Sequence, residues 1–455
     1  MWKLFLWALL IVHQLNAAPG KITVGLSADY PPFEFKQGEE IVGFDADLAK
    51  AIGKELGLEV EIKDMSFAML FGALNAGEID AIISSVTINK EKSKNYDFSV
   101  PYYFDTFAIL HKAEKPVSKE TLSGKSIACQ MGTSGMQTWL KSQTSDAKIV
   151  LMDTMPQMAE ALKAKHIDGA LMDATQAKEF VKNSKNLSYT IVGNVSNGTG
   201  VVMKKGSPFK NQINTAIEAL KQKGVLKNLE SKWVEGNHAK PAHTVFNDFL
   251  FIAKGLPTTL TYSFLAIFLG GVLGVLFAIS RHLNRGAINW AIISLISVIR
   301  GTPVLLQLSF VYFSAPTLIG VKLSVLTAGV LTLGINSAAY IAEILRSGLQ
   351  SLPKGQFDAA QALGISKWYT WKDIILPQVL RNVFPSLINE IVTLTKETAL
   401  VSVLGEMDIM RRAQTLAAET YNYFEPMCLA GLIYYLLIKT IEFIGKTLEK
   451  RWHHA

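Results

Sequence analysis

The sequence predicts an α/β domain at residues 19–237, then a linker at 238–250 and an all-α membrane domain of five transmembrane helices at residues 251–455. Three observations support this division. Short β-like and helical runs alternate in the first part, long apolar runs fill the second, and only 18% of the 455 residues are charged while 49% are hydrophobic. So low a charged fraction is unusual for a wholly soluble protein.

Residues 1–18 have the pattern of a signal peptide. Lys3 supplies a positive start, and the apolar stretch at 4–12 is shorter than the ~20 residues that a helix needs to cross a bilayer. Ala17 and Ala18 offer small residues for cleavage, although Leu15 is larger than usual at its position. We therefore expect residues 19–237 to lie outside the cytoplasm.

The exported part alternates between strand-like and helix-like runs, at 21–26, 45–56, 59–62, 67–74 and 81–84 among others. Such alternation is typical of α/β domains with mainly parallel sheets.

An internal similarity indicates two such units. Residues 76–83 resemble residues 164–171, and each segment enters an apolar strand that polar residues follow, namely Ser84, Ser85 and Thr87 in one case and Asp173 in the other. Ligands of open α/β sheets bind beyond the carboxyl ends of the strands, so two facing units would form a cleft lined by these residues. The alternative is that the shared Ile-Asp pair reflects local turn chemistry alone.

The five predicted spans are the long apolar runs at 259–279, 304–319, 323–345, 387–404 and 427–444. Pro316 interrupts the second run, so its limits are soft. The apolar segment at 287–298 precedes Arg300, and we expect it to lie at the membrane interface.

Charge predicts the orientation of the spans. Lys and Arg gather after the first, third and fifth runs, for example at Arg281, Arg346 and Lys450, whereas the loop between the fourth and fifth runs is mixed. The positive-inside rule then gives an external N-terminal domain, periplasmic or extracellular, and a cytoplasmic C-terminus in a multi-pass protein of a bacterial plasma (inner) membrane. The net charge of +7 is scattered along the chain, which does not favour nucleic-acid binding.

Several motifs of the exported part, in order along the chain, resemble the polar amino-acid family (family 3) of bacterial solute-binding proteins. They are 25–35 (GLSADYPPFEF), 43–48 (GFDADL), 84–87 (SSVT), 96–103 (YDFSVPYY), Gly124-Lys125, Gly132-Thr133 and 171–173 (LMD). The resemblance covers about residues 21–235. It implies the type II periplasmic-binding-protein fold, with lobe 1 at about 21–107 and 203–237, lobe 2 at about 110–200, and hinges near 107–111 and 200–204.

The resemblance also implies how a small zwitterion would be held. Tyr30 and Phe67 would sandwich its side chain, and Asp173 would hold its ammonium group. Its carboxylate would meet a cation, hydroxyls and backbone amides, supplied by Ser84, Ser85, Thr87, Lys92 and Thr133.

Two positions depart from the family pattern. Lys92 stands where Arg is usual, which keeps the charge but loses the two-pronged fork. Ser27 stands where an acid often precedes the aromatic residue, which weakens the case for a basic ligand, and Asp29 is expected to point elsewhere.

The membrane part resembles, over about residues 254–450, the permeases that work with such binding proteins. The motifs are 300–303 (RGTP), 339–348 (AYIAEILRSG), 354–360 (KGQFDAA) with Gly364 and 376–378 (LPQ), and 396–400 (KETAL). The third is the cytoplasmic coupling loop of that family, which would rest on a separate ATPase through Gly355, Asp358, Ala359, Ala360, Gly364 and Pro377. Asp358 replaces the usual Glu.

This resemblance implies amino-acid import by a homodimer with two copies of an ATP-binding cassette subunit, which would carry the ATP and Mg²⁺. We expect no cofactor, metal or catalytic residue on this chain itself, which would contact membrane lipid and an amino-acid ligand. Gly124-Lys125-Ser126 does not complete a phosphate-binding loop, because residue 119 is Lys rather than Gly.

Three other functions use the same binding fold. A ligand-gated channel of the glutamate-receptor kind normally has membrane segments that interrupt the binding domain, whereas here both lobes precede the first span. Enzymes such as cyclohexadienyl dehydratases and transglycosylases would not explain the spans. A sensor without transport that uses the same binding fold stays open as an alternative.

Overall fold

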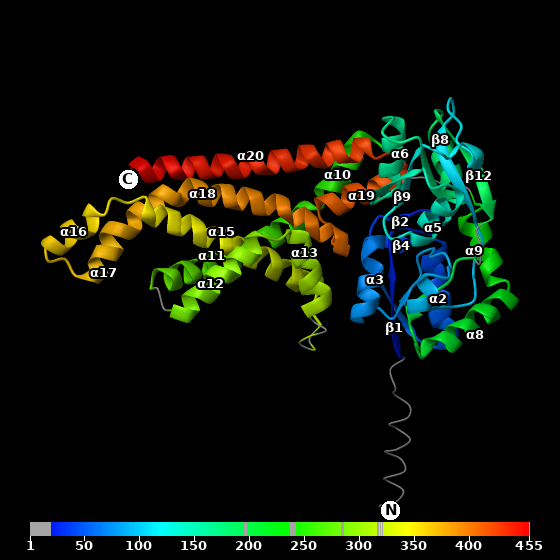
Figure 1. Cartoon of the computed structure of the whole chain (residues 1–455), viewed down its shortest axis with the longest axis horizontal. Helices are drawn as coiled ribbons and strands as arrows, with labels where there is room; N and C mark the ends of the chain where they lie inside the picture. The colour runs from blue at the N-terminus through cyan, green and yellow to red at the C-terminus, as the bar shows by residue number, and fades with distance from the viewer. Residues whose placement is uncertain are drawn as a thin grey trace, which may run out of the picture. The chain divides into compact units, whose positions relative to one another are not determined.

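The computed structural model describes residues 20–194, 198–236, 243–283, 286–315, 318, 320 and 322–454 (Figure 1). The chain forms two compact units. One holds the described residues up to His243 together with Gln414–Glu425, and the other holds Thr244–Ala413 with the described residues from Pro426 onward. The predicted signal peptide and Pro316 lie outside the described residues, as do residues 238–242 of the predicted linker. Its last part, from Val245, belongs to helix α10 (Val245–Ala253) rather than to a linker.

Lobe 1 of the first unit is built on a five-stranded sheet. Its strand order is β5 (Glu59–Asp64), β1 (Lys21–Leu26), β6 (Ala81–Ile82), β13 (Val202–Lys204) and β7 (Tyr96–Phe98). The pairs of β1 are parallel and those of β13 are antiparallel. The helices of this lobe are α2 (Phe44–Leu56), α3 (Phe67–Ala76), α4 (Lys92–Asn95), α8 (Phe209–Gln222) and α9 (Val225–Trp233), and β2 (Asp29–Tyr30), β3 (Glu34–Gln37) and β4 (Glu40–Val42) form a small antiparallel sheet.

Lobe 2 has a second five-stranded sheet with the order β10 (Lys148–Met152), β9 (Ser126–Gln130), β11 (Gly169–Asp173), β8 (Thr106–Lys112) and β12 (Leu187–Asn194). Its helices are η1 (Lys119–Thr121), α5 (Ser134–Gln143), α6 (Met155–Lys163) and α7 (Ala174–Lys182). Two lobes of this kind confirm the predicted fold class for the N-terminal part.

The internal similarity corresponds to one bonding pattern that occurs once in each sheet. The Thr23 N–H donates to Oδ2 of Asp80 at 2.8 Å, and the Ser126 N–H donates to Oδ2 of Asp168 at 2.9 Å. The backbone N–H of each aspartate returns a bond of 2.8 Å to the carbonyl of the same partner. The Ile-Asp pair therefore sets the entry of β6 and β11 beside a neighbouring strand.

The two lobes are connected by residues 99–105 and by the segment that ends at 198–201, where Thr199 bridges to both Thr87 and Tyr103. The sequence placed one hinge at 107–111, but these residues form β8. Phe107 to Leu110 are at most 1% exposed in the core of lobe 2. These apolar residues, which the sequence suggested as a β-like hinge, form a buried strand. The connection between the lobes precedes this strand.

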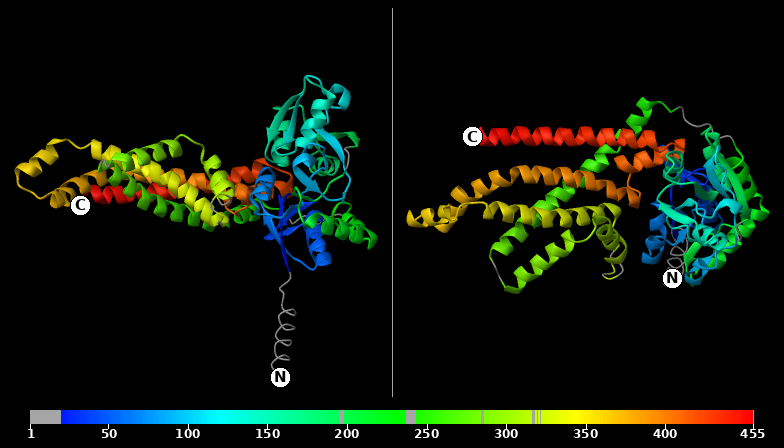
Figure 2. Two further views of the ribbon diagram at one scale, coloured as in Figure 1. Left: turned by 60° about the horizontal axis from the view of Figure 1, so that its bottom comes forward. Right: turned by 45° about the horizontal axis from the view of Figure 1, so that its top comes forward.

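The second unit is helical. Its elements are α10 (Val245–Ala253), α11 (Leu256–His282), α12 (Gly286–Arg300), α13 (Val304–Ser309), η2 (Phe310–Ser314), α15 (Val325–Gln350), α16 (Gly355–Ala362), α17 (Lys367–Tyr369), η3 (Thr370–Ile375), α18 (Leu376–Glu397), η4 (Thr398–Leu404), α19 (Ile409–Thr420) and α20 (Phe424–His454). Helices α11, α15 and α18 pack against one another (Figure 2). A Cβ added at Gly270 or Gly274 of α11 would come within 2.9 Å of Ser337 or 2.7 Å of Ile341 on α15, so these glycines allow the close packing.

Three helices among the described residues are long and apolar enough to cross a membrane, at Val245–His282, Val325–Gln350 and Phe424–Arg451. A fourth crossing requires Gly286–Arg300 and Val304–Ser314 to act as one span bent by 108°. The fourth predicted span, at 387–404, corresponds to the end of α18 and the 3-10 helix η4. Helix α18 starts earlier, at Leu376, and is less apolar because it carries Asn389 and Glu390. The count of five spans therefore stays a prediction.

Candidate ligand-binding site and coupling loop

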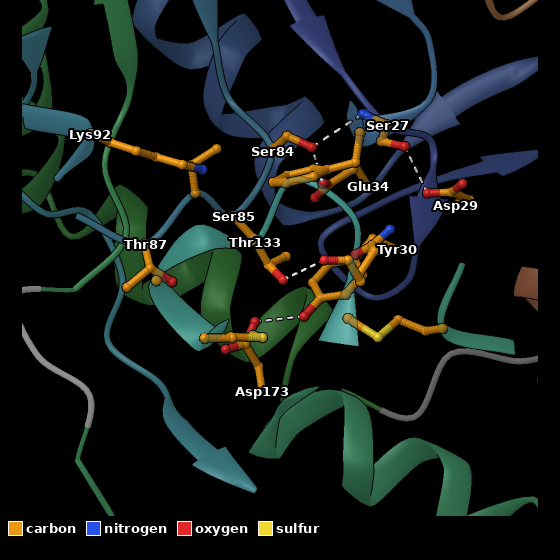
Figure 3. A pocket seen from close by; sticks show the side chains of 16 residues that line it. Ser27, Asp29, Tyr30, Glu34, Ser84, Ser85, Thr87, Lys92, Thr133 and Asp173 are labelled. Carbon is orange, nitrogen blue, oxygen red and sulfur yellow. Dashed lines mark hydrogen bonds between the residues drawn. The ribbon is translucent and has the colours of Figure 1, made fainter. Parts of the chain in front are cut away.

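All eight residues predicted to bind ligand line one pocket (Figure 3): Tyr30, Phe67, Ser84, Ser85, Thr87, Lys92, Thr133 and Asp173. Lobe 1 contributes six of them, from β2, the start of α3, the turn after β6 and the start of α4. Lobe 2 contributes Thr133, just before α5, and Asp173, at the end of β11. The carboxyl ends of β6 and β11 thus supply polar groups to the same space.

The lobes touch across the pocket at Tyr30 and Asp173. The Tyr30 hydroxyl donates to Oδ2 of Asp173 at 2.5 Å, and both side chains are buried. Burial, and then the charge of Asp105, raises the pKa of Asp173 to about 7, while the Tyr30 hydrogen bond acts in the opposite direction. Near neutral pH, the charge of the Asp173 carboxyl group therefore depends on the groups that contact it.

Lys92 forms a second contact between the lobes. Its Nζ donates to the carbonyl oxygen of Gly132 at 3.0 Å and lies 4.1 Å from the centre of the Phe71 ring and 5.7 Å from that of Phe67. Burial lowers the pKa of Lys92 to about 8. A carbonyl and two ring faces hold the cation at the pocket, and no carboxylate among the described residues forms an ion pair with it. An incoming anion could therefore pair with it.

Three of the predicted hydroxyl ligands already donate to protein groups. Ser84 Oγ donates to Oε1 of Glu34 at 2.6 Å, Ser85 Oγ donates to Oδ2 of Asp45 at 3.1 Å, and Thr133 Oγ1 donates to the carbonyl of Gln130 at 2.6 Å. Their hydroxyl protons hold the site together in this structure. Two predicted donors remain, the Thr87 hydroxyl and the Lys92 ammonium group. Neither is bound to a carboxylate of the described residues or used within its own turn.

The pocket also contains residues that the sequence prediction missed: Ser27, Asp29, Glu34, Val86, Gln130, Gly135, Met136 and Met155. Asp29 was expected to point elsewhere, but it lines the pocket and accepts a hydrogen bond of 2.8 Å from the hydroxyl of Ser27 (Figure 3). Asp29 and Tyr30 form the two-residue strand β2, which pairs with β3, and both side chains are buried there. The motif GLSADYPPFEF contains these residues, but nothing in it marks their direction.

The predicted coupling loop forms a helical hairpin at the start of α18. Gly355 begins α16, Ala360 is buried on it, and Asp358 and Ala359 are exposed. Gly364 adopts a left-handed φ of 67° after α16, which glycine tolerates best, and Pro377 lies in the first turn of α18. Leu363 and Trp368, at 76% and 69% exposure, leave the hairpin with an apolar surface.

Glu343, in the motif 339–348, gathers three guanidinium groups. Arg281 donates to Oε1 of Glu343, Arg346 forms a 2.7 Å ion pair with Oε2, and Arg300 lies 3.9 Å from Oε2. The cluster joins α11, α12 and α15 at one carboxylate.

The comparisons with known proteins agree with this architecture. Residues 22–236 match the bacterial extracellular solute-binding proteins of family 3, and residues 270–454 match the inner membrane component of binding-protein-dependent transport systems. The chain belongs to these two families, one in each half.

Three relatives make the assignment more specific. A permease named for glutamine transport, GlnP of Rickettsia typhi, is 50% identical over 202 residues, which are 44% of this chain and 93% of the relative. The arginine transport system permease protein ArtQ of Bacillus subtilis is 43% identical over 201 residues, 44% of this chain and 92% of the relative. The arginine-binding extracellular protein ArtP of Bacillus subtilis is 30% identical over 250 residues, 52% of this chain and 98% of the relative.

The protein is therefore an amino-acid ABC transporter permease fused to its solute-binding domain. Membership in this permease family implies an inner-membrane, multi-pass protein, an amino-acid cargo and an ATPase partner. These matches give no support to the channel, enzyme or sensor alternatives.

Proposed function

We propose that this chain captures an amino acid with a basic side chain, arginine above all, and passes it through its own membrane domain. The observation that carries the proposal is a pocket that brings the aromatic side chains of Tyr30 and Phe67 together with Asp173 and Lys92. The relatives named for arginine transport and arginine binding are consistent with it.

The pocket carries the two charges that the α-groups of an amino acid would meet. Among the described residues that line it, Lys92 is the one Lys or Arg, and Asp173 lies on the other lobe. A bound zwitterion would place its ammonium on Asp173 and its carboxylate on Lys92. Its side chain would then lie against the rings of Tyr30 and Phe67, whose faces attract a cation such as a guanidinium group.

Glutamine is the strongest alternative cargo, because several permease relatives are named for its transport. Its neutral amide would gain less from the ring faces of Tyr30 and Phe67 than a guanidinium group would. Acidic amino acids would place a negative side chain against the same ring faces and are disfavoured. Selectivity should thus follow the order arginine, glutamine, glutamate.

The test is calorimetric titration of the full chain in lipid nanodiscs with these three amino acids, for the wild type and for Phe67→Leu, which removes a ring and keeps an apolar side chain. We expect the wild type to bind arginine most tightly, and the variant to lose about tenfold more in arginine affinity than in glutamine affinity. Equal loss for both ligands would show that the ring does not read the charge of the side chain. Tighter binding of glutamine by the wild type would overturn the choice of a basic cargo.

The transport cycle would use two copies of this chain and two ATPase subunits. Closure of the lobes around the ligand would select the form that the membrane domain accepts, and ATP binding by the ATPase subunits, transmitted through the coupling loop, would open the spans to the outside. The N-terminal domain would lie outside the membrane and the C-terminus in the cytoplasm. Reconstitution with the partner ATPase should give ATP-dependent arginine uptake and a mass that corresponds to two chains and two ATPases; uptake by a single chain would refute the homodimer.

A further inference from the structure

The turn that follows β6 contains a serine in a backbone conformation that serine rarely adopts. Ser85 has a φ of 46°, in the left-handed region that favours glycine. The chain leaves β6 at Ile82, bends at Ser85, and pairs Thr87 with Thr199 two residues later. The bend therefore determines how Thr87 and the backbone around it enter the pocket.

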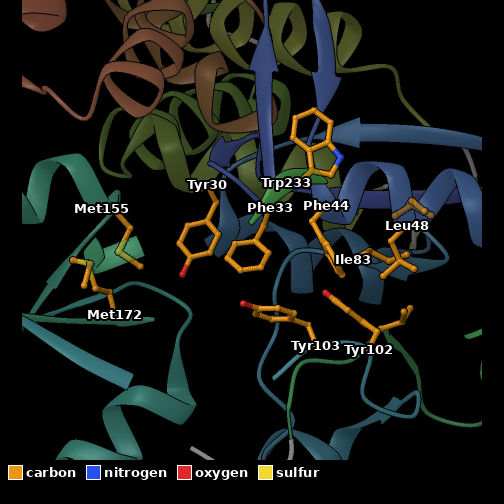
Figure 4. Close-up of a cluster of buried hydrophobic side chains, with 14 of the residues drawn as sticks. Tyr30, Phe33, Phe44, Leu48, Ile83, Tyr102, Tyr103, Met155, Met172 and Trp233 are labelled. Carbon is orange, nitrogen blue, oxygen red and sulfur yellow. The ribbon is translucent and has the colours of Figure 1, made fainter. Parts of the chain in front are cut away.

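One buried carboxylate holds this bend. Oδ2 of Asp45 accepts the backbone N–H of Ser85 at 2.5 Å, the Ser85 hydroxyl at 3.1 Å and the Tyr102 hydroxyl at 3.0 Å. Asp45 is 0% exposed in the first turn of α2, where the helix dipole favours a negative charge. Tyr102 is itself fixed in a buried aromatic cluster, with its ring 6.1 Å from that of Phe44 (Figure 4).

A second buried acid completes the arrangement. Oε2 of Glu34 and Oδ1 of Asp45 are buried, and neither accepts a hydrogen bond from the described residues. Burial, and then the charge of Asp45, raises the pKa of Glu34 well above its usual range. Through its other oxygen, Glu34 accepts the Ser84 hydroxyl at 2.6 Å, and Ser84 in turn accepts the Ser27 N–H at 3.1 Å.

We infer that Asp45 is a positioning residue for recognition of the ligand α-carboxylate. Asp45 does not line the pocket, and it uses both polar groups of Ser85 that could have reached a ligand. Its role is to stabilise the left-handed conformation of Ser85, so that Thr87 and Lys92 face the ligand carboxylate. This inference rests on the proposed function, because it assigns Asp45 to one half of the proposed amino-acid site.

The test compares L-arginine with L-argininamide, which lacks only the carboxylate charge, by calorimetry on the full chain in nanodiscs. We expect the wild type to prefer L-arginine by at least tenfold. Asp45→Asn keeps the shape but replaces one acceptor oxygen by an NH₂ donor. Its L-arginine affinity should fall by about tenfold and its L-argininamide affinity by less than threefold, so that most of the preference is lost.

A matched pair at Ser85 keeps the test decisive if Asp45→Asn does not fold. Ser85→Gly and Ser85→Ala both remove the hydroxyl, but glycine adopts a positive φ freely and alanine does not. Ser85→Gly should retain the preference for L-arginine, and Ser85→Ala should lose it. In the Asp45→Asn background, Ser85→Gly should restore part of the preference.

The outcomes separate this inference from the proposed function. Absence of L-arginine and L-glutamine binding by the wild type would refute the proposed site and this inference with it. A normal wild-type preference, combined with an unchanged preference in Asp45→Asn or with equal behaviour of the two Ser85 variants, would refute the inference and leave the proposed function standing. An equal loss of both ligands in a folded Asp45→Asn would mean a general structural role, which also overturns it.

Discussion

The hydroxyl of Tyr30 donates a hydrogen bond of 2.5 Å to Oδ2 of Asp173 and joins β2 of lobe 1 to the end of β11 in lobe 2. Asp173 is also the acid proposed to receive the ligand ammonium group. A neutral phenol therefore bonds to the same carboxyl group that the ligand ammonium would meet. Entry of a ligand would exchange a neutral donor for a charged one, and this exchange makes binding depend on pH.

The first prediction is that arginine affinity is greatest between about pH 7 and pH 8. The pKa of Asp173 is raised to about 7, and a ligand ammonium would lower it, so binding below pH 7 releases a proton and weakens as pH falls. The pKa of Lys92 is lowered to about 8, and a ligand carboxylate would raise it, so binding above pH 8 takes up a proton and weakens as pH rises. Below pH 7 and above pH 8, the decrease in arginine affinity should approach a factor of about ten per pH unit.

Calorimetry in buffers of different ionisation enthalpy counts these protons directly. We expect proton release at pH 6 and proton uptake at pH 8.5. At pH 8.5 protons can be taken up by Lys92 and by the ligand's own ammonium group. Lys92→Arg should abolish the first contribution, because Arg stays charged, and so separates it from the second. A proton count of zero at pH 6 would show that Asp173 is not the ammonium partner.

The second prediction concerns Tyr30→Phe, which keeps the ring and removes the bond to Asp173. Because that bond lowers the pKa of Asp173, its loss should raise this pKa further and move the acid side of the affinity profile to higher pH. Arginine affinity should therefore fall more at pH 6 than at pH 8. Tyr103→Phe is the matched control, since Tyr103 lies outside the pocket lining and its hydroxyl contacts Thr175 at 3.3 Å. Parallel profiles for wild type and Tyr30→Phe would contradict the prediction.

The sequence motifs identified the residues that follow strands, but not the inward-facing acids. Glu34 and Lys36 flank Phe35 in β3, and simple alternation would place Phe35 inside and the charged residues outside. In the structure Glu34 and Lys36 are 1% and 6% exposed. Each is compensated by a residue far along the chain: Ser84 for Glu34, and Asp64, at 3.0 Å, for Lys36. Periodicity within one segment cannot reveal such distant partners.

The membrane part was predictable where apolar runs are uninterrupted, as in α11 and α15. Helix α18 was less predictable, because polar residues interrupt the apolar run in its first half. Ser337 of α15 donates to Glu390 of α18 at 2.7 Å, so a polar side chain that breaks an apolar run is satisfied by a neighbouring helix. Helix α12 was expected at the interface, but with Val304–Ser314 it forms the bent pair, whose geometry no hydropathy pattern specifies.

The third prediction is that Glu343→Ala destabilises the membrane domain. It removes the acceptor of three guanidinium groups, and breaking a largely buried ion pair costs about 3 kcal/mol. The midpoint of thermal unfolding in detergent should fall by several degrees. Adding Arg281→Leu should recover part of the loss, because Arg281 is the most buried of the three bases, at 16% side-chain exposure, while Arg300 and Arg346 can turn toward solvent. If the double variant is less stable than the single one, the loss arises from packing rather than from unpaired charge.

The fourth prediction tests the coupling loop separately from ligand binding. Ala359 is exposed on α16 beside the buried Ala360, so a tryptophan at position 359 would project from the hairpin without disturbing its core. A short helix that rests in a groove of an ATPase needs a small side chain at the contact. Ala359→Trp should therefore reduce arginine-stimulated ATP hydrolysis of the reconstituted complex by at least tenfold, while arginine affinity of the chain alone stays unchanged. Ala359→Ser, which remains small, should keep most of the stimulation. Full stimulation in Ala359→Trp would place the ATPase contact elsewhere on the hairpin, whereas loss of arginine binding in the same variant would show that the substitution acts through the fold of the whole chain.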